Sequence, residues 1–384
     1  MSLYDILKGS DNVIVDYGKA VQELTRSKRA LTSVTLELSP VCNFTCPFCY
    51  ARVSPEQLKE RGEQIMRFDE WKRYIDEFAE MDVSNLTLTG GECMLHPDFE
   101  KIYRYIYGKG MAVNLMTNSS CLTDSILQMF RECPPDGIFT TLYGSSSETY
   151  QTVCGNAAYF DRVLANIRRM ADARLDVVLQ ITVSNDNVGD LEAVHRISKE
   201  LDIPLRVSTS LIRSGRCTEE LLEENSVDED ELSEINARMY GTDMFEKESV
   251  TIRPVPQPVI EKGITCAGGR CSCAITYRGK MQPCVVFDAL SVETKGRPLA
   301  DCWKELVALC DEVPRLVECI NCVHRPKCQT CMARHYNDTG EFGKPSPRLC
   351  FKCTHPEKAK EIEERFAKNG YLISDVDDID FRKK

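Results

Sequence analysis

The sequence predicts an α/β fold with a parallel sheet, followed by a cysteine-rich region. Two observations predict it. Short apolar runs typical of strands alternate with amphipathic helical patterns from about residue 33 to 210. After that, the proline-rich stretch Pro254–Pro258 precedes a segment dense in cysteine. Alternation of this kind indicates parallel strands joined by right-handed crossovers. Periodicity alone fits either an open doubly wound sheet or a barrel.

The predicted elements follow one another in a regular order. Each strand is a short apolar or β-branched run, and the strands are expected at Ser33–Ser39, Asn85–Thr89, Ala112–Thr117, Ile138–Tyr143, Val177–Val183 and Leu205–Ser208. Each helix carries an apolar stripe of helical period, as Trp71, Ile75 and Phe78 do. The helices are expected at Phe68–Met81, Asp98–Tyr107, Thr123–Glu132, Tyr159–Ala173 and Asp190–Leu201.

Composition divides the remainder of the chain. We expect an N-terminal extension at residues 1–32, the α/β region at 33–215, an acidic linker at 216–255 and a cysteine-rich domain at 256–384. In that last domain the pattern supports little regular structure beyond helices at Leu299–Glu312 and near Pro356–Lys368.

Bulk properties exclude several classes of protein. The 384 residues carry a net charge of −11, which argues against nucleic-acid binding because phosphate contacts need an excess of Lys and Arg. No apolar run is long enough to cross a bilayer, and residues 1–8 lack the features of a signal peptide. We therefore expect a cytoplasmic protein with no nucleic-acid or membrane partner.

Cysteine is unusually abundant, with 20 residues, and it occurs in blocks. A reducing cytoplasm favours metal binding over disulfides. The first block, Cys42, Cys46 and Cys49, is spaced CxxxCxxC directly after the first predicted strand. Three thiolates can hold three irons of a [4Fe–4S] cube and leave the fourth iron open to a small molecule. The alternative is a zinc site, but its nearest further ligands, Cys93 and His96, lie well downstream.

With this spacing after the first strand, the chain resembles the radical S-adenosylmethionine (SAM) superfamily. The resemblance implies a partial (β/α)6 TIM-like barrel whose open iron chelates SAM for reductive cleavage to a 5′-deoxyadenosyl radical. It also implies that Phe48 packs near the adenine and that Gly90, Gly91 and Glu92 bind the methionine amino group. Asn118 is expected either to contact the ribose or to cap a turn.

The second region resembles the SPASM subgroup of that family. Cys266, Gly279 and Cys284 read CX12GX4C, and four cysteines spaced CX2CX5CX2C follow. The resemblance implies two auxiliary [4Fe–4S] clusters, three clusters in all. One would use Cys266, Cys271, Cys284 and Cys331, and the other Cys319, Cys322, Cys328 and Cys350. Cys273 competes with Cys271, Cys353 competes with Cys350, and a pair of zinc knuckles is the rival interpretation.

The resemblance implies a maturase that modifies a ribosomally made peptide by hydrogen abstraction, giving a crosslink, thioether or epimer. Its partners would be a peptide or protein substrate and an electron donor such as flavodoxin or ferredoxin. Either a stand-alone leader-recognition protein presents the peptide, or the peptide docks directly on the barrel. Val285 replaces the Asp of sulfatase-maturing members, which argues against that activity. Cys217 follows the sixth strand, where some peptide epimerases carry a thiol that returns a hydrogen atom.

Two alternatives stay open. One is a maturase of a protein side chain or a small metabolite. The other, from a different class, is an iron–sulfur electron-transfer or scaffold protein, which would have no need of an open iron. Cysteines outside the predicted ligand sets are expected to be small buried residues, namely Cys121, Cys133, Cys154, Cys302 and Cys310.

Overall fold

The structure is a computed structural model. It describes residues 24–209, 211–213, 219–227, 251–252, 260–325, 328, 330–369 and 372–373. Cys217 and most of the predicted acidic linker lie outside these residues.

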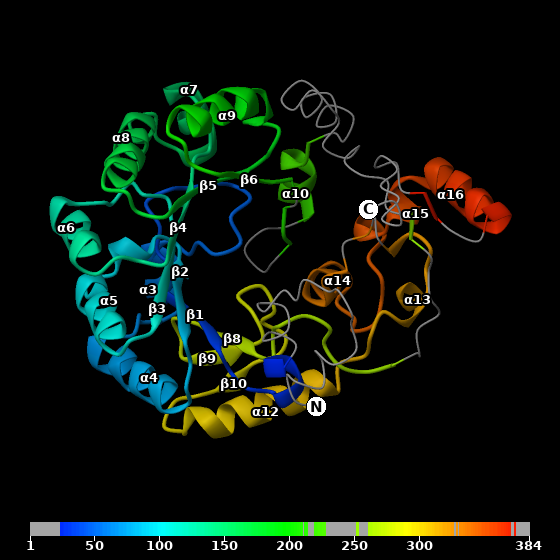
Figure 1. Ribbon diagram of the computed structural model, residues 1–384, viewed down its shortest axis with the longest axis horizontal. Helices are drawn as coiled ribbons and strands as arrows, with labels where there is room; N and C mark the ends of the chain where they lie inside the picture. The colour runs from blue at the N-terminus through cyan, green and yellow to red at the C-terminus, as the bar shows by residue number, and fades with distance from the viewer. Residues whose placement is uncertain are drawn as a thin grey trace, which may run out of the picture.

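The predicted α/β fold is confirmed as a curved, mostly parallel sheet of nine strands in the order β10-β9-β8-β1-β2-β3-β4-β5-β6 (Figure 1). Neighbours from β8 through β1 to β6 pair in parallel. All six predicted strands are present, and their bounds are β1 Ser33–Ser39, β2 Asn85–Gly90, β3 Ala112–Thr117, β4 Gly137–Thr141, β5 Val177–Thr182 and β6 Leu205–Ser208. The curvature is that of a partial barrel.

Helices cover one face of this sheet (Figure 1). They are α3 Pro55–Glu60, α4 Phe68–Glu80, α5 Phe99–Gly108, α6 Asp124–Glu132, α7 Ser147–Cys154, α8 Tyr159–Asp172 and α9 Leu191–Glu200. The predicted helices are confirmed to within two residues, whereas α3 and α7 are too short for periodicity to reveal. Capping explains α7, because the Ser146 side chain accepts from Thr149 N at its start and Gly155 ends it in the left-handed conformation.

The core lies between the helices and the sheet. Every second residue of β1, namely Val34, Leu36 and Leu38, is buried there against helical side chains such as Trp71 and Phe78. In the part of the chain that the structure describes, no such layer of helices covers the opposite, concave face of the sheet. The side chains on that face are partly exposed.

Part of the C-terminal region joins the main sheet. It adds three strands to the main sheet, β8 Ser272–Ile275, β9 Lys280–Gln282 and β10 Val292–Glu293. β8 pairs in parallel with β1, and Leu36 lies opposite Ile275. These runs of two to four residues are too short for a sequence pattern, and the pairing edge of β1 is what makes them strands.

The remaining described elements lie beyond or beside the sheet. They are α10 Glu219–Asn225, α12 Leu299–Asp311, α13 Val317–Ile320, α14 Met332–Thr339, α15 Phe351–Thr354, α16 Pro356–Asn369, and the short antiparallel pair β7 Thr251–Ile252 and β11 Leu372–Ile373. Among the described residues, none of the helices has the length and hydrophobicity needed to cross a membrane.

Candidate functional site: three groups of cysteine thiols

The first block of cysteines lies in a loop at the carboxyl end of β1, as predicted. Two glycines at the end of β2 allow this loop to pass close by. Gly91 N donates to Ser39 O at 2.8 Å, and a Cβ on Gly90 or Gly91 would lie 2.1 Å from Ser39 O or 2.4 Å from Val41 O. No side chain fits at those distances. The glycines therefore bring the β2 end against the cysteine loop itself.

The three thiols of this loop lie in a protein environment that disfavours bare thiolates. Burial raises the pKa of Cys42 to about 12, and Glu92, Cys46 and Cys49 raise it further. Two donors oppose this effect, since Phe44 N lies 3.3 Å and Asn118 Nδ2 lies 3.6 Å from Cys42 Sγ. Iron would supply the positive charge that such buried thiolates lack, so the three thiols fit a cluster.

Two further residues approach Cys46, and the sequence did not reveal either as part of the site. Thr45 N donates to the carbonyl oxygen of Cys154 at 3.0 Å, which fixes the loop to the end of α7. The side chains of Cys154 and Tyr143 contact the Cys46 thiol. Burial and the hydrogen bond with Cys154 raise the pKa of Cys46, while the Tyr143 hydroxyl lowers it. Cys154 is buried, as expected for a small apolar residue, but it also supports the cysteine loop.

Phe48, which the resemblance assigned to the adenine, is buried beside the loop. Its ring lies 6.0 Å from that of Tyr143, centroid to centroid. Phe44 packs nearby against Tyr143, Tyr150 and Tyr159. Aromatic packing of this kind gives the loop a rigid apolar base.

Glu92 is fully buried beneath the cysteine loop. It is 0% exposed, and burial raises its pKa. Its oxygens accept from Met94 N at 3.0 Å, Asn118 N at 2.7 Å, and Thr117 Oγ1 at 2.8 and 2.9 Å. These donors use most of its acceptor capacity. In this structure Glu92 therefore joins the ends of β2 and β3 beneath the cysteine loop.

Asn118 connects that network to the loop. Its side-chain oxygen accepts from Ser120 N at 2.9 Å, which is the turn-capping geometry considered in the sequence. Its Nδ2 donates to Asn43 Oδ1 at 3.2 Å, and Asn43 Nδ2 in turn donates to Ser120 Oγ at 2.8 Å. Asn118 thereby lies against two residues of the cysteine loop.

The second group of thiols contains three of the four residues assigned to one auxiliary cluster. Burial raises the pKa of Cys266 and raises that of Cys284 to about 12, and the charge of Cys331 adds to both shifts. Burial and then Asp311 raise the pKa of Cys310 of α12 to about 12, and Cys266 and Cys284 contribute to that shift. Cys273 is buried in the core, and burial, followed by Cys310, raises its pKa. Cys271, the preferred fourth ligand, is also buried.

The third group unites all four residues assigned to the other auxiliary cluster. Burial raises the pKa of Cys319 to about 11, and Cys322, Cys328 and Cys350 add to the effect. Phe351 N donates to Cys328 Sγ at 3.3 Å. Cys353 is exposed and its thiol contacts Cys350. These four sulfurs would hold a cluster near the surface.

Nearby histidines make other contacts. His324 Nε2 pairs with Glu363 Oε1 at 3.0 Å, and His335 Nδ1 accepts from Ser346 N at 2.8 Å. Across the described ranges, no three Cys, His, Asp or Glu side chains are grouped closely enough to bind a single metal ion.

A cavity of about 200 Å³ lies beside the cysteine loop. Tyr50 and Ala51, which follow Cys49, line it together with Glu37 of β1 and with Lys280 and Gln282 of β9. The concave face of the sheet continues from it. The partly exposed side chains on that face are mainly polar, and they are Thr35, Glu37, Thr87, Asn114, Met116, Phe139, Thr141, Val178, Gln180 and Thr182.

Comparison with known proteins agrees with this geometry. The sequence model of the Radical SAM superfamily matches residues 36–197. The chain is 25% identical over 344 residues to the AdoMet-dependent heme synthase of Methanosarcina barkeri, covering 83% of this chain and 96% of that protein. It is 24% identical over 359 residues to the mycofactocin maturase MftC of Mycobacterium tuberculosis, covering 89% of each.

A solved structure shares the fold. Streptococcus suis SuiB, in a crystal structure with its precursor peptide SuiA, superimposes with a TM-score of 0.62 at 12% identity, covering 88% of this chain and 83% of that one. The matched residues 36–197 contain the cysteine loop, the glycine pair and the network beneath them. Residues 36–197 are therefore similar in sequence to the radical SAM superfamily, and the fold of the chain agrees with that similarity.

Proposed function

We propose that this chain is a peptide maturase that modifies a ribosomally made peptide by hydrogen-atom abstraction. When bound, a [4Fe–4S] cluster and SAM supply one-electron reduction and a 5′-deoxyadenosyl radical. Cys42, Cys46 and Cys49 would hold that cluster. The two C-terminal groups of thiols would hold auxiliary clusters, with Cys271 as the proposed fourth ligand of the second group.

The polar concave face is the observation that carries the proposal. Thr35, Asn114 and Gln180 are evenly spread over it, and each offers hydrogen-bonding groups to a substrate. A peptide backbone presents one donor and one acceptor per residue and needs such partners when it is buried. An extended chain would lie along this face, which no layer of described helices covers. Similarity to a mycofactocin maturase and to the fold of a peptide-bound enzyme supports the same class of substrate.

The residues of the chain have defined tasks in this proposal. Glu92, Thr117 and Asn118 hold the cysteine loop at the barrel edge, and Phe48 with Tyr143 excludes water behind it. Glu37, Lys280 and Gln282 line the cavity in which the reacting residue of the peptide would lie. The proposed SAM contacts are Phe48, Gly90, Gly91, Glu92 and Asn118.

The test is an anaerobic assay of the iron-reconstituted full chain with dithionite and SAM. The candidate substrate is a synthetic peptide encoded by a short open reading frame beside the gene. We expect 5′-deoxyadenosine together with a change in peptide mass, both detected by liquid chromatography and mass spectrometry. An iron-loaded protein that releases no 5′-deoxyadenosine would instead be an electron carrier, and the proposal would be wrong.

A second candidate is synthesis of haem, which similarity to the M. barkeri enzyme over nearly its whole length favours. A planar macrocycle would require a broad apolar slot rather than a polar face. Titration with iron coproporphyrin, followed in the Soret region, separates the two. Saturable 1:1 binding, together with formation of 5′-deoxyadenosine that depends on the porphyrin, would mean that the substrate is a tetrapyrrole and not a peptide.

A further inference from the structure

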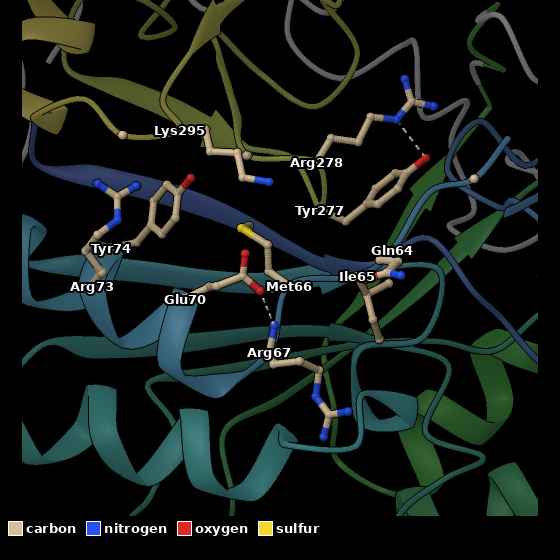
Figure 2. Close-up of a pocket in the computed structure, with 13 residues that line it drawn as sticks. Gln64, Ile65, Met66, Arg67, Glu70, Arg73, Tyr74, Tyr277, Arg278 and Lys295 are labelled. Carbon is tan, nitrogen blue, oxygen red and sulfur yellow. Dashed lines mark hydrogen bonds between the residues drawn. The ribbon is translucent and has the colours of Figure 1, made fainter. Parts of the chain in front are cut away.

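A second and larger cavity, of about 510 Å³, lies outside the concave face. One wall is formed by the loop before α4 and the first turns of that helix, including Met66, Glu70 and Arg73. The other wall is formed by the turn between β8 and β9 and by the loop after β10, where Lys295 lies. Figure 2 shows these side chains directed into the space between the two walls.

This cavity adjoins the smaller one beside the cysteine loop. Tyr277 and Arg278 line both. The partition is firmly held, because Tyr277 OH donates to Glu63 Oε2 at 2.7 Å and Arg278 Nη2 lies 2.8 Å from Glu63 Oε1. A ligand that extends past this partition would occupy both cavities at once.

Positive charge predominates among the side chains that reach into the larger cavity. Arg73 and Lys295 contribute cations, and Glu70 contributes the single carboxylate of the lining, whereas Arg278 lines the cavity with its guanidinium directed away from Lys295. The Arg67 guanidinium points away and pairs with Asp98 at 2.7 Å. The net charge of the whole chain is −11, so the positive charge in this cavity is opposite in sign to that of the protein as a whole.

These charges differ in how far the protein already satisfies them. Arg73 pairs with Glu77 at 2.8 Å, and Arg278 uses Nη2 on Glu63 and Nε on the Tyr277 hydroxyl. Glu70 Oε2 accepts from Arg67 N at 3.0 Å. Lys295 is exposed and makes no hydrogen bond or ion pair with any part of the chain that the structure describes. It is therefore the cation available to a ligand.

We propose that the larger cavity recognises an acidic side chain of the peptide substrate, a few residues from the residue that reacts. Lys295 Nζ would donate a charge-assisted hydrogen bond to that carboxylate. The peptide would pass across Tyr277 and place its reacting residue in the smaller cavity. This inference rests on the proposed function and assigns to it a substrate class, peptides with an acidic flank.

Binding of a defined probe tests the inference. A fluorescein-labelled octapeptide with four Asp residues is compared, by fluorescence anisotropy, with the same peptide carrying Asn in place of Asp. The protein is the iron-reconstituted full chain. We expect the acidic peptide to bind about tenfold more tightly to the wild type, the value of one charge-assisted contact. Lys295→Glu should abolish that preference.

The matched control is Lys304→Glu, the same change at an exposed lysine of α12 that does not line the cavity. It should leave the preference intact. If both variants weakened binding of the acidic peptide equally, the preference would come from the overall charge of the protein, and the proposal would be overturned. Displacement of the peptide by inorganic phosphate at equal concentration would also overturn it, because the cavity would then be a general anion site.

A separate measurement distinguishes failure of this inference from failure of the proposed function. Wild type and Lys295→Glu should release 5′-deoxyadenosine from SAM at the same rate without peptide, because Lys295 lies away from the cysteine loop. If neither releases it, the proposed function fails whatever the peptide does. If both release it and the wild type does not prefer the acidic peptide, the recognition site alone is wrong.

Discussion

The chain gathers cysteines in two contrasting ways. The loop that carries Cys42, Cys46 and Cys49 lies at the edge of a nine-stranded sheet, beneath which a network of buried hydrogen bonds joins β2 to β3. The segment from Cys319 to Cys353 is held by short helices, and its cysteines are partly or fully exposed. The first group is built into a framework that needs no metal. The second lies outside that sheet and has fewer buried side chains to define it.

This difference indicates how far the structure of each group would depend on bound iron. A site preorganised by packing keeps its geometry when empty, whereas a site in a small cysteine-rich segment takes part of its folding energy from metal binding. The cysteine loop should therefore lose function but keep its structure when iron is absent. The Cys319–Cys353 segment should lose structure as well.

The largest expected effect is on the chemistry. Replacing Cys42, Cys46 and Cys49 together by Ala should reduce 5′-deoxyadenosine formation to background and remove about four of about twelve irons per chain. The barrel should still fold, since these thiols lie at the sheet edge. Iron analysis and circular dichroism measure the two outcomes.

Cys133→Ala is the control, because Cys133 is half-buried and belongs to none of the three groups of thiols. It should retain both the iron and the activity. Full iron content in the triple variant would show that the loop is no cluster site. A total near four irons in the wild type would discard both auxiliary assignments.

The second prediction concerns iron removal. Chelation under reducing conditions should raise amide hydrogen exchange across Cys319–Cys353 by an order of magnitude or more. Exchange in β1 and β2 should change little, because their protection comes from the sheet. Peptide-resolved mass spectrometry reports both regions in one sample. Equal deprotection of both would show that the barrel also needs its cluster to fold.

The same contrast explains what could be predicted from sequence. The strands at the barrel and the helices α4, α5, α6, α8 and α9 follow from periodicity, because one face of each is buried. The cysteine spacing located the loop. Cys154 and Tyr143 were missed because they reach Cys46 only through tertiary structure, from the end of α7 and the end of β4.

Glu92 shows what a motif does not reveal. Its place after two glycines predicts a ligand contact, which stays a prediction, and the sequence did not reveal the donors from Met94, Thr117 and Asn118 that surround it. The number of donors on a buried carboxylate depends on which strands meet there. β8, β9 and β10 escaped prediction for the same reason, since each is defined by a neighbour rather than by its own pattern.

The third prediction tests whether that network supports the loop. Glu92→Gln places an amide group against the two backbone N–H donors and should reduce the free energy of unfolding by about 2–3 kcal/mol. Thr117→Val removes only the hydroxyl shared by both oxygens and should cost about 1 kcal/mol. Urea denaturation of both variants measures the difference. Equal stability of wild type and Glu92→Gln would mean that Glu92 does not hold β2 and β3 together.

The smallest expected effect is a dependence of barrel stability on pH, and it comes from His96 near the same network. His96 is buried, its Nε2 bonds to Met66 O at 2.8 Å, and its Nδ1 accepts from Asp98 N at 3.1 Å. Burial lowers its pKa below the ordinary value of 6.5. Between those two pKa values the unfolded chain binds a proton that the folded chain does not, so stability falls as the pH drops below 6.5.

One such group changes the free energy of unfolding by at most about 1.4 kcal/mol per pH unit. His96→Gln removes this titration, and its unfolding free energy should therefore fall less steeply than that of the wild type between pH 7 and 5. Urea denaturation at several pH values, monitored by the far-ultraviolet signal of the barrel, measures the slope. Parallel curves for the two proteins would mean that the pKa of His96 is the same in the folded and the unfolded chain, and therefore that the loop before α4 does not bury it from water.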